Sequence, residues 1–406
     1  MQVEPSNRKR SPLRIAVLNS HPIQYFAPLY TYLNATEDFD ITALYCSDFS
    51  LRGAKDPGFG QKVTWDLDLL AGYRAVFLGE RAKTRAPGGF WSLICPEVWR
   101  EVRSGRYDAL ILYGHNYAVN LLGLLAAKTA GVKVFMRSDT HLGLQRHGFK
   151  QRFRRPLMNL LYRACDRCLA IGTANHAFYR AMGVPEHKVV KVPFTVDNDR
   201  FIAAARLSDQ ERRHLLQRLG TDPNKPVVLY ASKFQRRKHP DDLLVAVARL
   251  RDRGVQCTVL MVGSGEMQTE LQQLVAVLNL PDVHFTGFMN QNDLPQVYGA
   301  SDIFVLPAEN EPWGLIVNEV MCAALPVVIS EEVGCVPDLV HDGENGLLFQ
   351  AGDIEGIVRA LESLLTDRVL RERMGQRSLE RITRWSYAEC RTGLLGALQN
   401  GPITSS

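Results

Sequence analysis

The sequence predicts an α/β protein with two doubly wound, Rossmann-like domains. The clearest observation is the stretch 302–328, where a continuous apolar run at 303–306 precedes a polar loop, an apolar helical period from Gly314, and a second apolar run from Val327. Strand–helix–strand units of this kind build parallel sheets. The second observation is length, because 406 residues exceed what one core usually holds. Similar apolar runs recur on both sides of residue 200, so two such domains are expected.

The composition is that of a globular protein. Apolar residues make up 46% of the chain and charged residues 22%, with a formal net charge of +5. The longest apolar stretch, 118–127, is interrupted by Asn120 and falls short of the ~20 residues needed to cross a bilayer. The basic start of the chain lacks an apolar segment of signal-peptide type, so a cytoplasmic location is expected. The lone Cys165-x-x-Cys168 pair has no second pair at zinc spacing, which argues against a metal or redox role.

The loop after 303–306 suits a ligand that carries both phosphates and hydroxyls. A helix beginning after Gly314 would present unpaired backbone N–H groups and its dipole to an anion. Glu311 and Glu319 flank this helix end, and each carboxylate can accept hydrogen bonds from two hydroxyls. A nucleotide-sugar has both kinds of group. The alternative is that Glu311 is an ordinary loop acid and Glu319 a solvated helix residue.

The stretch Glu311-Pro-Trp-Gly-Leu-x3-Glu319, followed by Ala-Ala-Leu-Pro-Val-Val at 323–328, resembles the E-x7-E signature of the family 4 retaining glycosyltransferases. The resemblance covers about residues 14–398 and is more specific in the second half. It implies that Glu311 contacts the donor sugar and Glu319 the ribose. It also implies that the backbone amides of Gly314 and Leu315 bind the donor, together with the preceding Trp313.

The resemblance further implies the GT-B architecture, in which two Rossmann-like domains face one another across a cleft. We expect a disordered tail at 1–13, an acceptor-side domain at 14–200 and a nucleotide-sugar-binding domain at 201–385. The last segment, 386–406, is expected to form a crossover helix that packs back on the first domain and to end in a tail.

Basic side chains follow the strand predicted at 227–231. Lys233 and Lys238 would form charge-assisted hydrogen bonds with a diphosphate. The family pattern here is glycine-arginine-x5-lysine, so Lys233 stands in place of an arginine and loses bidentate phosphate binding, for which Arg236 or Arg237 could compensate. Both lysines are predicted to neutralise the leaving diphosphate during catalysis.

Two other strand-ending turns are expected to contact the donor. Gly263 and Gly265 resemble the family turn that lets the backbone approach the nucleotide. Phe288 and Met289 lie in the segment whose backbone reads the base in the family, although core packing explains Phe288 nearly as well.

Polar residues also end strands in the first half of the chain. Asp139 lies nearest the position where the family carries a histidine that contacts the donor sugar, and His115 ends the preceding strand, so both are predicted catalytic residues. His115 could instead be a turn histidine. Acceptor contacts are predicted from the polar residues His21, Gln24, Tyr25 and His141, with a turn cap at His21 and core packing of Tyr25 as the alternative.

Residues 47–86 are irregular and are expected to provide variable acceptor contacts. Their Asp66-x-Asp68 has the spacing of metal-dependent sugar transferases, but it does not end a strand-like run, so we expect no metal or other cofactor. The basic segment 146–167 predicts either a solvated helix face or peripheral contact with anionic lipid at the inner face of the membrane. Nucleic-acid binding is not expected, because no recognition motif accompanies the charge.

The sequence therefore predicts a retaining glycosyltransferase that moves a sugar from a nucleotide diphosphate donor to an acceptor hydroxyl, in polysaccharide, glycolipid or small-molecule glycoside synthesis. UDP is the expected carrier because it is the commonest in the family. No side chain is an obvious nucleophile, so front-face transfer is expected. The alternatives are a nucleotide-sugar epimerase of similar plan and a non-catalytic nucleotide-sugar-binding protein. An NAD-linked dehydrogenase is disfavoured because no G-x-G-x-x-G follows the first strand.

Overall fold

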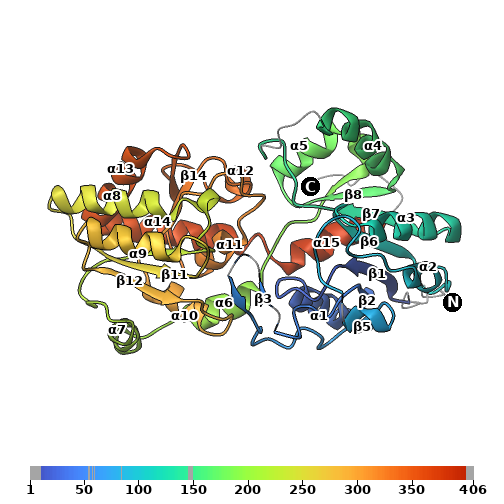
Figure 1. Ribbon diagram of the computed structural model, residues 1–406, viewed down its shortest axis with the longest axis horizontal. Coiled ribbons are helices and arrows are strands. Elements are labelled where there is room, and N and C mark those ends of the chain that lie inside the picture. Colours follow the sequence, from blue (N-terminus) through green and yellow to red (C-terminus); the bar gives the residue numbers. More distant parts are fainter. Residues whose placement is uncertain are drawn as a thin grey trace, which may run out of the picture. The chain divides into compact units, whose positions relative to one another are not determined.

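The computed structural model describes residues 11–53, 55–56, 58, 60–83, 85–144 and 150–398 (Figure 1). The chain divides into two compact units. Unit 1 consists of residues 1–52, 68–138 and 161–169, and unit 2 consists of residues 53–67, 139–160 and 170–406. Each unit therefore contains segments that are separated in the sequence, and each is considered by itself below.

Two parallel sheets form the framework. The first has seven strands in the order β5-β2-β1-β6-β7-β8-β9, and the second has six in the order β12-β11-β10-β13-β14-β15. In both sheets the order moves outward from a central strand in two directions, as in doubly wound folds. The first sheet comprises β1 (Leu13–Asn19), β2 (Phe39–Tyr45), β5 (Arg74–Phe77), β6 (Ala109–Tyr113), β7 (Lys133–Arg137), β8 (Arg167–Ala170) and β9 (Val189–Lys191).

The second sheet lies within unit 2 and carries the candidate site. It comprises β10 (Val227–Ala231), β11 (Thr258–Val262), β12 (Val283–Gly287), β13 (Ile303–Leu306), β14 (Val327–Ser330) and β15 (Gly346–Phe349). The paired strands run parallel throughout. Parallel strands end at the same edge of a sheet, so the loops after β10, β11 and β13 meet there.

Helices connect the strands of both sheets. In the first half of the chain they are α1 (Ala27–Ala35), α2 (Glu97–Val102), α3 (Ala118–Ala130), α4 (Lys150–Ala164) and α5 (Thr173–Ala181), with short 3-10 turns η1 (Glu80–Lys83) and η2 (Glu186–Lys188). Those that follow are α6 (Asn198–Ala205), α7 (Asp209–Arg218), η3 (Arg236–Lys238), α8 (Pro240–Asp252), α9 (Gln268–Val277), α10 (Leu294–Ala300), α11 (Leu315–Cys322), α12 (Val336–Leu339), α13 (Ile354–Thr366), α14 (Arg368–Ile382) and α15 (Tyr387–Leu398). No helix in the described part of the chain is long and apolar enough to span a membrane.

The core of unit 2 explains why these segments fold as they do. Strands β10, β11 and β13 are buried along their whole length, which matches their unbroken apolar sequences. Helices α8 and α13 lie side by side (Figure 1) and contribute buried aliphatic residues such as Leu244 and Leu361 to the same cluster. Burying one such side chain stabilises the fold by roughly 1.5–3 kcal/mol. The side chains of Asp353 and Asp367 cap the first turns of α13 and α14.

The predicted fold class is confirmed, because both sheets are parallel and alternate with helices. The stretch 302–328 forms β13, α11 and β14 as expected. The expectation of an irregular stretch at 47–86 was partly wrong. It contains β5, which pairs with β2 at the sheet edge, and the two-residue strands β3 (Lys55–Asp56) and β4 (Gln61–Lys62). Edge strands this short and half-buried give little periodic signal in a sequence.

Candidate functional site

The centre of the candidate site is a buried ion pair between Glu311 and Lys238. Glu311 lies in the loop after β13, and Lys238 ends η3 in the loop after β10. Their side chains are only 12% and 8% exposed and are in direct contact through Oε2 and Nζ. The same carboxylate oxygen accepts a hydrogen bond from Nη1 of Arg237 at 3.0 Å. The structure thus brings together one acid and two basic groups from two strand-ending loops.

The charges of this cluster determine one another's ionisation. Burial alone would raise the pKa of Glu311, but Lys238 and then Arg237 outweigh it, so the pKa is lowered and the carboxylate is ionised. Burial lowers the pKa of Lys238, and the neighbouring cations Arg237 and Lys233 lower it further, while Glu311 opposes the shift. A diphosphate arriving here would add negative charge beside the lysine and favour its charged form.

The shifted pKa of Glu311 predicts a pH dependence of stability. Its pKa in the folded chain lies below the ordinary value of 4.5, so the ionised carboxylate stabilises the fold above that pH, and the contribution is lost as the pH falls through the folded-state value. We therefore expect the Glu311→Gln variant to unfold at a lower denaturant concentration than the wild type near neutral pH. The difference should shrink steadily below about pH 4.5. Equal midpoints at neutral pH would contradict the ion pair.

Gly314 forms the junction between the acidic loop and α11. Its φ of +87° lies in the left-handed region, which favours glycine, and a Cβ here would meet Val333 at 3.0 Å. This conformation starts α11 at Leu315, so the first backbone N–H groups of the helix are left without intrahelical partners, as at any helix start. Two hydrogen bonds fasten the preceding loop to residues 334 and 335, from Gly334 N to the carbonyl of Glu311 at 3.0 Å and from Cys335 N to that of Trp313 at 3.1 Å.

Glu319 lies on the buried side of α11. Only 1% of the residue is exposed, so it is not the solvated helix residue of the alternative interpretation. Its Oε2 accepts a hydrogen bond from the hydroxyl of Tyr298 at 2.7 Å. A carboxylate has about four acceptor positions, so one such side chain can accept hydrogen bonds from several hydroxyls. Tyr298 in α10 could not have been predicted as its partner, since nothing local in the sequence relates the two helices.

Trp313 is part of an aromatic cluster. The residue is 3% exposed, and its Nε1 donates to Oδ1 of Asn318 at 3.0 Å. Its ring stacks on Trp385, with centroids 5.8 Å apart, and lies 6.3 Å from the ring of Phe194. The indole nitrogen of Trp385 in turn donates to the carbonyl of Phe194. This packing holds the backbone between Glu311 and Gly314 in place.

The structure shows why positions 263 and 265 are occupied by glycine. A Cβ on Gly263 would lie 2.1 Å from the carbonyl oxygen of Ser232, and one on Gly265 would lie 2.5 Å from that of Phe234. The loop after β11 therefore packs directly against the loop that carries Lys233. Phe234 N also donates to the carbonyl of Ser264 at 3.0 Å. The two glycines permit a loop-to-loop contact, in addition to any approach of the backbone to a nucleotide.

The segment with Phe288 and Met289 is half-buried. It is contacted by residues 65 and 66, which are distant in the sequence. Trp65 meets the ring of Phe288 edge-on, with centroids 6.0 Å apart. The neighbouring carboxylate of Asp66 accepts backbone hydrogen bonds from Gln291 at 3.2 Å and Asn292 at 3.0 Å. Asp66 thus has a structural role as a backbone acceptor, which the D-x-D spacing did not reveal.

His141 lies against the Glu311 loop. Its Nδ1 accepts a hydrogen bond from the backbone N–H of Gly143 at 3.1 Å, so the proton is assigned to Nε2, which donates to the carbonyl of Glu311 at 3.2 Å. The histidine is 8% exposed. It therefore positions the loop carbonyl, whereas the nearby Asp139 is exposed.

The remaining candidates lie in unit 1 and are described separately from the Glu311 cluster. His115 is 8% exposed, and its Nδ1 is 3.0 Å from the hydroxyl of Tyr162. His21 contacts Ser20 Oγ through Nδ1 at 2.9 Å and meets the ring of Phe49 edge-on. Gln24 and Tyr25 are half-buried in the turn before α1.

Comparison with known proteins identifies the family. The model of the glycosyl transferases group 1 matches residues 211–381, and the glycosyl transferase 4-like domain matches residues 55–195. The chain belongs to the group 1, family 4-like glycosyltransferases. The second of these matches includes the unit-2 segment with Trp65 and the turn with His141, and the first includes Lys238, Glu311 and Glu319.

Relatives of this chain include the sulfoquinovosyl transferase SQD2 of Arabidopsis thaliana, 28% identical over 74% of the chain and 58% of that protein. A D-inositol 3-phosphate glycosyltransferase of Streptomyces avermitilis is 30% identical over 72% of the chain and 64% of its own length. The matches thus span less than two thirds of these curated relatives.

Solved structures agree on the fold. The structure of Anabaena HepE in complex with UDP and glucose has a TM-score of 0.72 at 19% identity, covering 95% of this chain and 99% of that one. The sucrose-phosphate synthase of Thermosynechococcus elongatus has a TM-score of 0.71 at 18% identity, covering 94% and 97% of the two chains. At these identities the likeness supports the GT-B fold alone.

Proposed function

We propose that the protein is a retaining glycosyltransferase that moves a sugar from a nucleotide diphosphate donor to an acceptor hydroxyl. The observation that carries the proposal is the buried Glu311–Lys238 pair beside the left-handed Gly314 at the start of α11. The fold itself has little need of a buried ion pair next to a helix N-terminus. A sugar diphosphate, in contrast, needs both an acceptor for its hydroxyls and a site for its phosphates, and this arrangement offers both. Family membership supports the same conclusion.

In the proposed mechanism, positive side chains and backbone amides that are positioned before the donor binds stabilise the leaving group. The backbone amides at Gly314 and Leu315 and the ammonium groups of Lys233 and Lys238 would stabilise the negative charge that develops on the leaving diphosphate. Arg237, which contacts Glu311, adds a guanidinium that compensates for the lysine at position 233. Glu311 would accept hydroxyls of the donor sugar, and Glu319 those of the ribose. We propose front-face transfer without a covalent intermediate and without a metal ion.

The proposals for the nucleotide carrier and for the acceptor side rest on similarity to other proteins of this fold. UDP is proposed as the carrier because the HepE structures contain UDP and UDP-glucose. The proposed acceptor-side domain comprises residues 14–200 and the donor side residues 201–385. Within the first, Asp139 and His115 are the proposed catalytic residues, and His21, Gln24, Tyr25 and His141 the proposed acceptor contacts. Peripheral membrane contact through 146–167 is supported by two exposed leucines of α4, Leu157 at 64% and Leu160 at 67%. Residues 146–149 of that segment lie outside the described part of the chain.

Calorimetric titration with UDP, GDP and ADP in EDTA, followed by UDP-sugars, tests the donor site. We expect one diphosphate to bind without metal and the Glu319→Gln variant to lose roughly tenfold or more in affinity, because one charged hydrogen-bond acceptor of the ribose is lost. The matched control is Tyr298→Phe, which removes the 2.7 Å hydrogen bond but keeps the carboxylate. Its affinity should stay within about threefold of the wild type.

The outcomes separate the alternatives. Equal losses in both variants would mean that Glu319 acts only through its contact with Tyr298, which would remove the ribose role. No nucleotide binding by the wild type would overturn the donor site. Turnover of a UDP-sugar to its epimer without any acceptor would favour the epimerase, and binding without turnover in the presence of diverse sugar and lipid-linked acceptors would favour the binding protein.

A further inference from the structure

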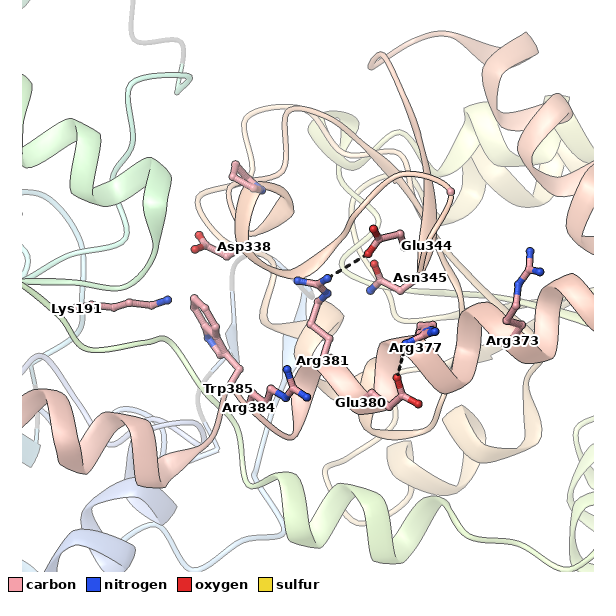
Figure 2. A pocket seen from close by; sticks show the side chains of 12 residues that line it. Lys191, Asp338, Glu344, Asn345, Arg373, Arg377, Glu380, Arg381, Arg384 and Trp385 are labelled. Carbon is pink, nitrogen blue, oxygen red and sulfur yellow. Dashed lines mark hydrogen bonds and ion pairs between the residues drawn. The ribbon is translucent and has the colours of Figure 1, made fainter. Parts of the chain in front are cut away.

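A polar cavity lies in unit 2, built from elements other than the strand-ending loops of the candidate site. Its volume is about 730 Å³. We name it the basic groove and define it by its charged and aromatic lining, Lys191, Asp338, Glu344, Arg373, Arg377, Glu380, Arg381, Arg384 and Trp385. Figure 2 shows these side chains gathered around the C-terminal part of α14 and the turn before β15.

Helical spacing produces one basic face. Arg373, Arg377 and Arg381 lie four residues apart on α14, so they project from the same side of the helix. At a rise of about 1.5 Å per residue, the first and third are separated by roughly 12 Å along the axis. Arg384 and Lys191 continue the row, with Nζ of Lys191 lying 4.2 Å from the ring centre of Trp385.

The acidic residues of the groove balance only part of this charge. Arg377 pairs with Glu380 at 3.1 Å and Arg381 with Glu344 at 3.4 Å, the two dashed pairs of Figure 2. Asp338 accepts hydrogen bonds from the backbone and hydroxyl of Thr173. Five cationic and three anionic side chains line the groove, an excess of two positive charges. In the described part of the chain, neither guanidinium of Arg373 and Arg384 forms an ion pair or side-chain hydrogen bond.

We propose that the basic groove binds a ligand that carries several phosphate groups spread over about 12 Å. Guanidinium groups match phosphate oxygens in pairs and remain charged at every physiological pH, so exposed arginines in a concave row are suited to such a ligand. A single phosphate would fill little of a cavity this large. A soluble polyphosphate and a row of phospholipid headgroups have this chemistry in common.

The groove also has a physical connection to the donor loop. Trp385 forms its wall and stacks on Trp313, which lies two residues after Glu311. A ligand that draws Lys191 away from Trp385 would therefore act on the packing that holds the Glu311 loop. The proposal of a binding site does not depend on this connection or on transferase activity.

The test compares two double variants with the same change of charge. Arg373→Glu with Arg384→Glu alters the groove, whereas Arg359→Glu with Arg368→Glu alters two exposed arginines, 67% and 79% exposed, that do not line it. The full-length chain is titrated with myo-inositol hexakisphosphate and sedimented with vesicles of phosphatidylcholine containing 30% phosphatidylglycerol or none. Melting temperatures establish that both variants fold.

We expect binding of inositol hexakisphosphate or of the anionic vesicles, weakened roughly tenfold per arginine in the groove variant and by less than about threefold in the control. Lys238→Met should leave this binding unchanged, which separates it from the donor site. Binding of the soluble probe identifies a free polyphosphate as the ligand class, and binding of anionic vesicles alone identifies headgroups. Equal weakening in both double variants, or no binding of either probe by the wild type, would overturn the proposal.

Discussion

Replacing Glu311 by leucine is expected to lower the free energy of unfolding by about 3–5 kcal/mol, because it leaves the ammonium of Lys238 buried without a counter-charge. The side chain of Lys238 is 8% exposed, and Glu311 is its one acidic partner in the described part of the chain. The reverse change, Lys238→Met, should cost less, because Glu311 keeps its 3.0 Å hydrogen bond with Arg237. Chemical unfolding followed by circular dichroism measures both effects.

The double variant Glu311→Leu with Lys238→Met completes this experiment. Replacing both charges by apolar side chains removes the uncompensated charge, and such replacements of buried pairs are often neutral or stabilising. We expect the double variant to recover most of the stability that the glutamate variant loses, while all three variants fail to transfer sugar. A double variant that is as unstable as the sum of the single ones would show that the two charges do not interact.

Gly263→Ala is expected to be the most damaging substitution at a candidate site glycine, with a loss of roughly 2–5 kcal/mol. The added Cβ would stand 2.1 Å from the backbone oxygen of Ser232, at a φ of +134° that side-chain-bearing residues rarely adopt. A backbone atom cannot rotate away as a side chain does. The loop with Lys233 would have to shift, so donor affinity should fall as well.

A control for this prediction is Gly254→Ala, where φ is +80° and a Cβ would meet no atom within 4 Å. It isolates the conformational cost of the left-handed region, about 1–2 kcal/mol. Comparison of the two midpoints of chemical unfolding gives the cost of the clash, and calorimetry with the nucleotide found to bind gives its effect on the site. If the two variants were equally stable, the contact with Ser232 would be absent.

Local patterns predicted those parts of the fold that depend on local physics. The unit β13–α11–β14 was readable because its strands are buried on both faces and its helix is apolar at regular spacing. Strand β5 was missed because Arg74 is exposed, the strand has four residues and the others are only half-buried. Its place in the sheet is set by pairing with β2, which is not a property of its own sequence.

The candidate site was also predictable only in part. Residues such as Lys238, Glu311 and Glu319 were singled out by their place after strands and by the family signature. Their partners were not, because the contacts join distant segments. Lys238 and Glu311 are 73 residues apart in sequence, and neither motif indicates that the two side chains share one buried position. The sequence likewise suggested a nucleotide contact for Gly263 but could not reveal the carbonyl of Ser232 beside it.

The contact between residues 64–66 and 288–292 affects how the chain folds as it is made. Asn290 donates to the carbonyl of Thr64 across 226 residues of sequence. At a synthesis rate of about 5–20 residues per second, the earlier segment waits roughly ten to forty-five seconds for its partner to emerge. During this time residues 64–66, which belong to unit 2, cannot form these contacts. The order of synthesis and the order of folding are therefore different, because residues 64–66 are made early but can form these contacts only after residue 292 has been made.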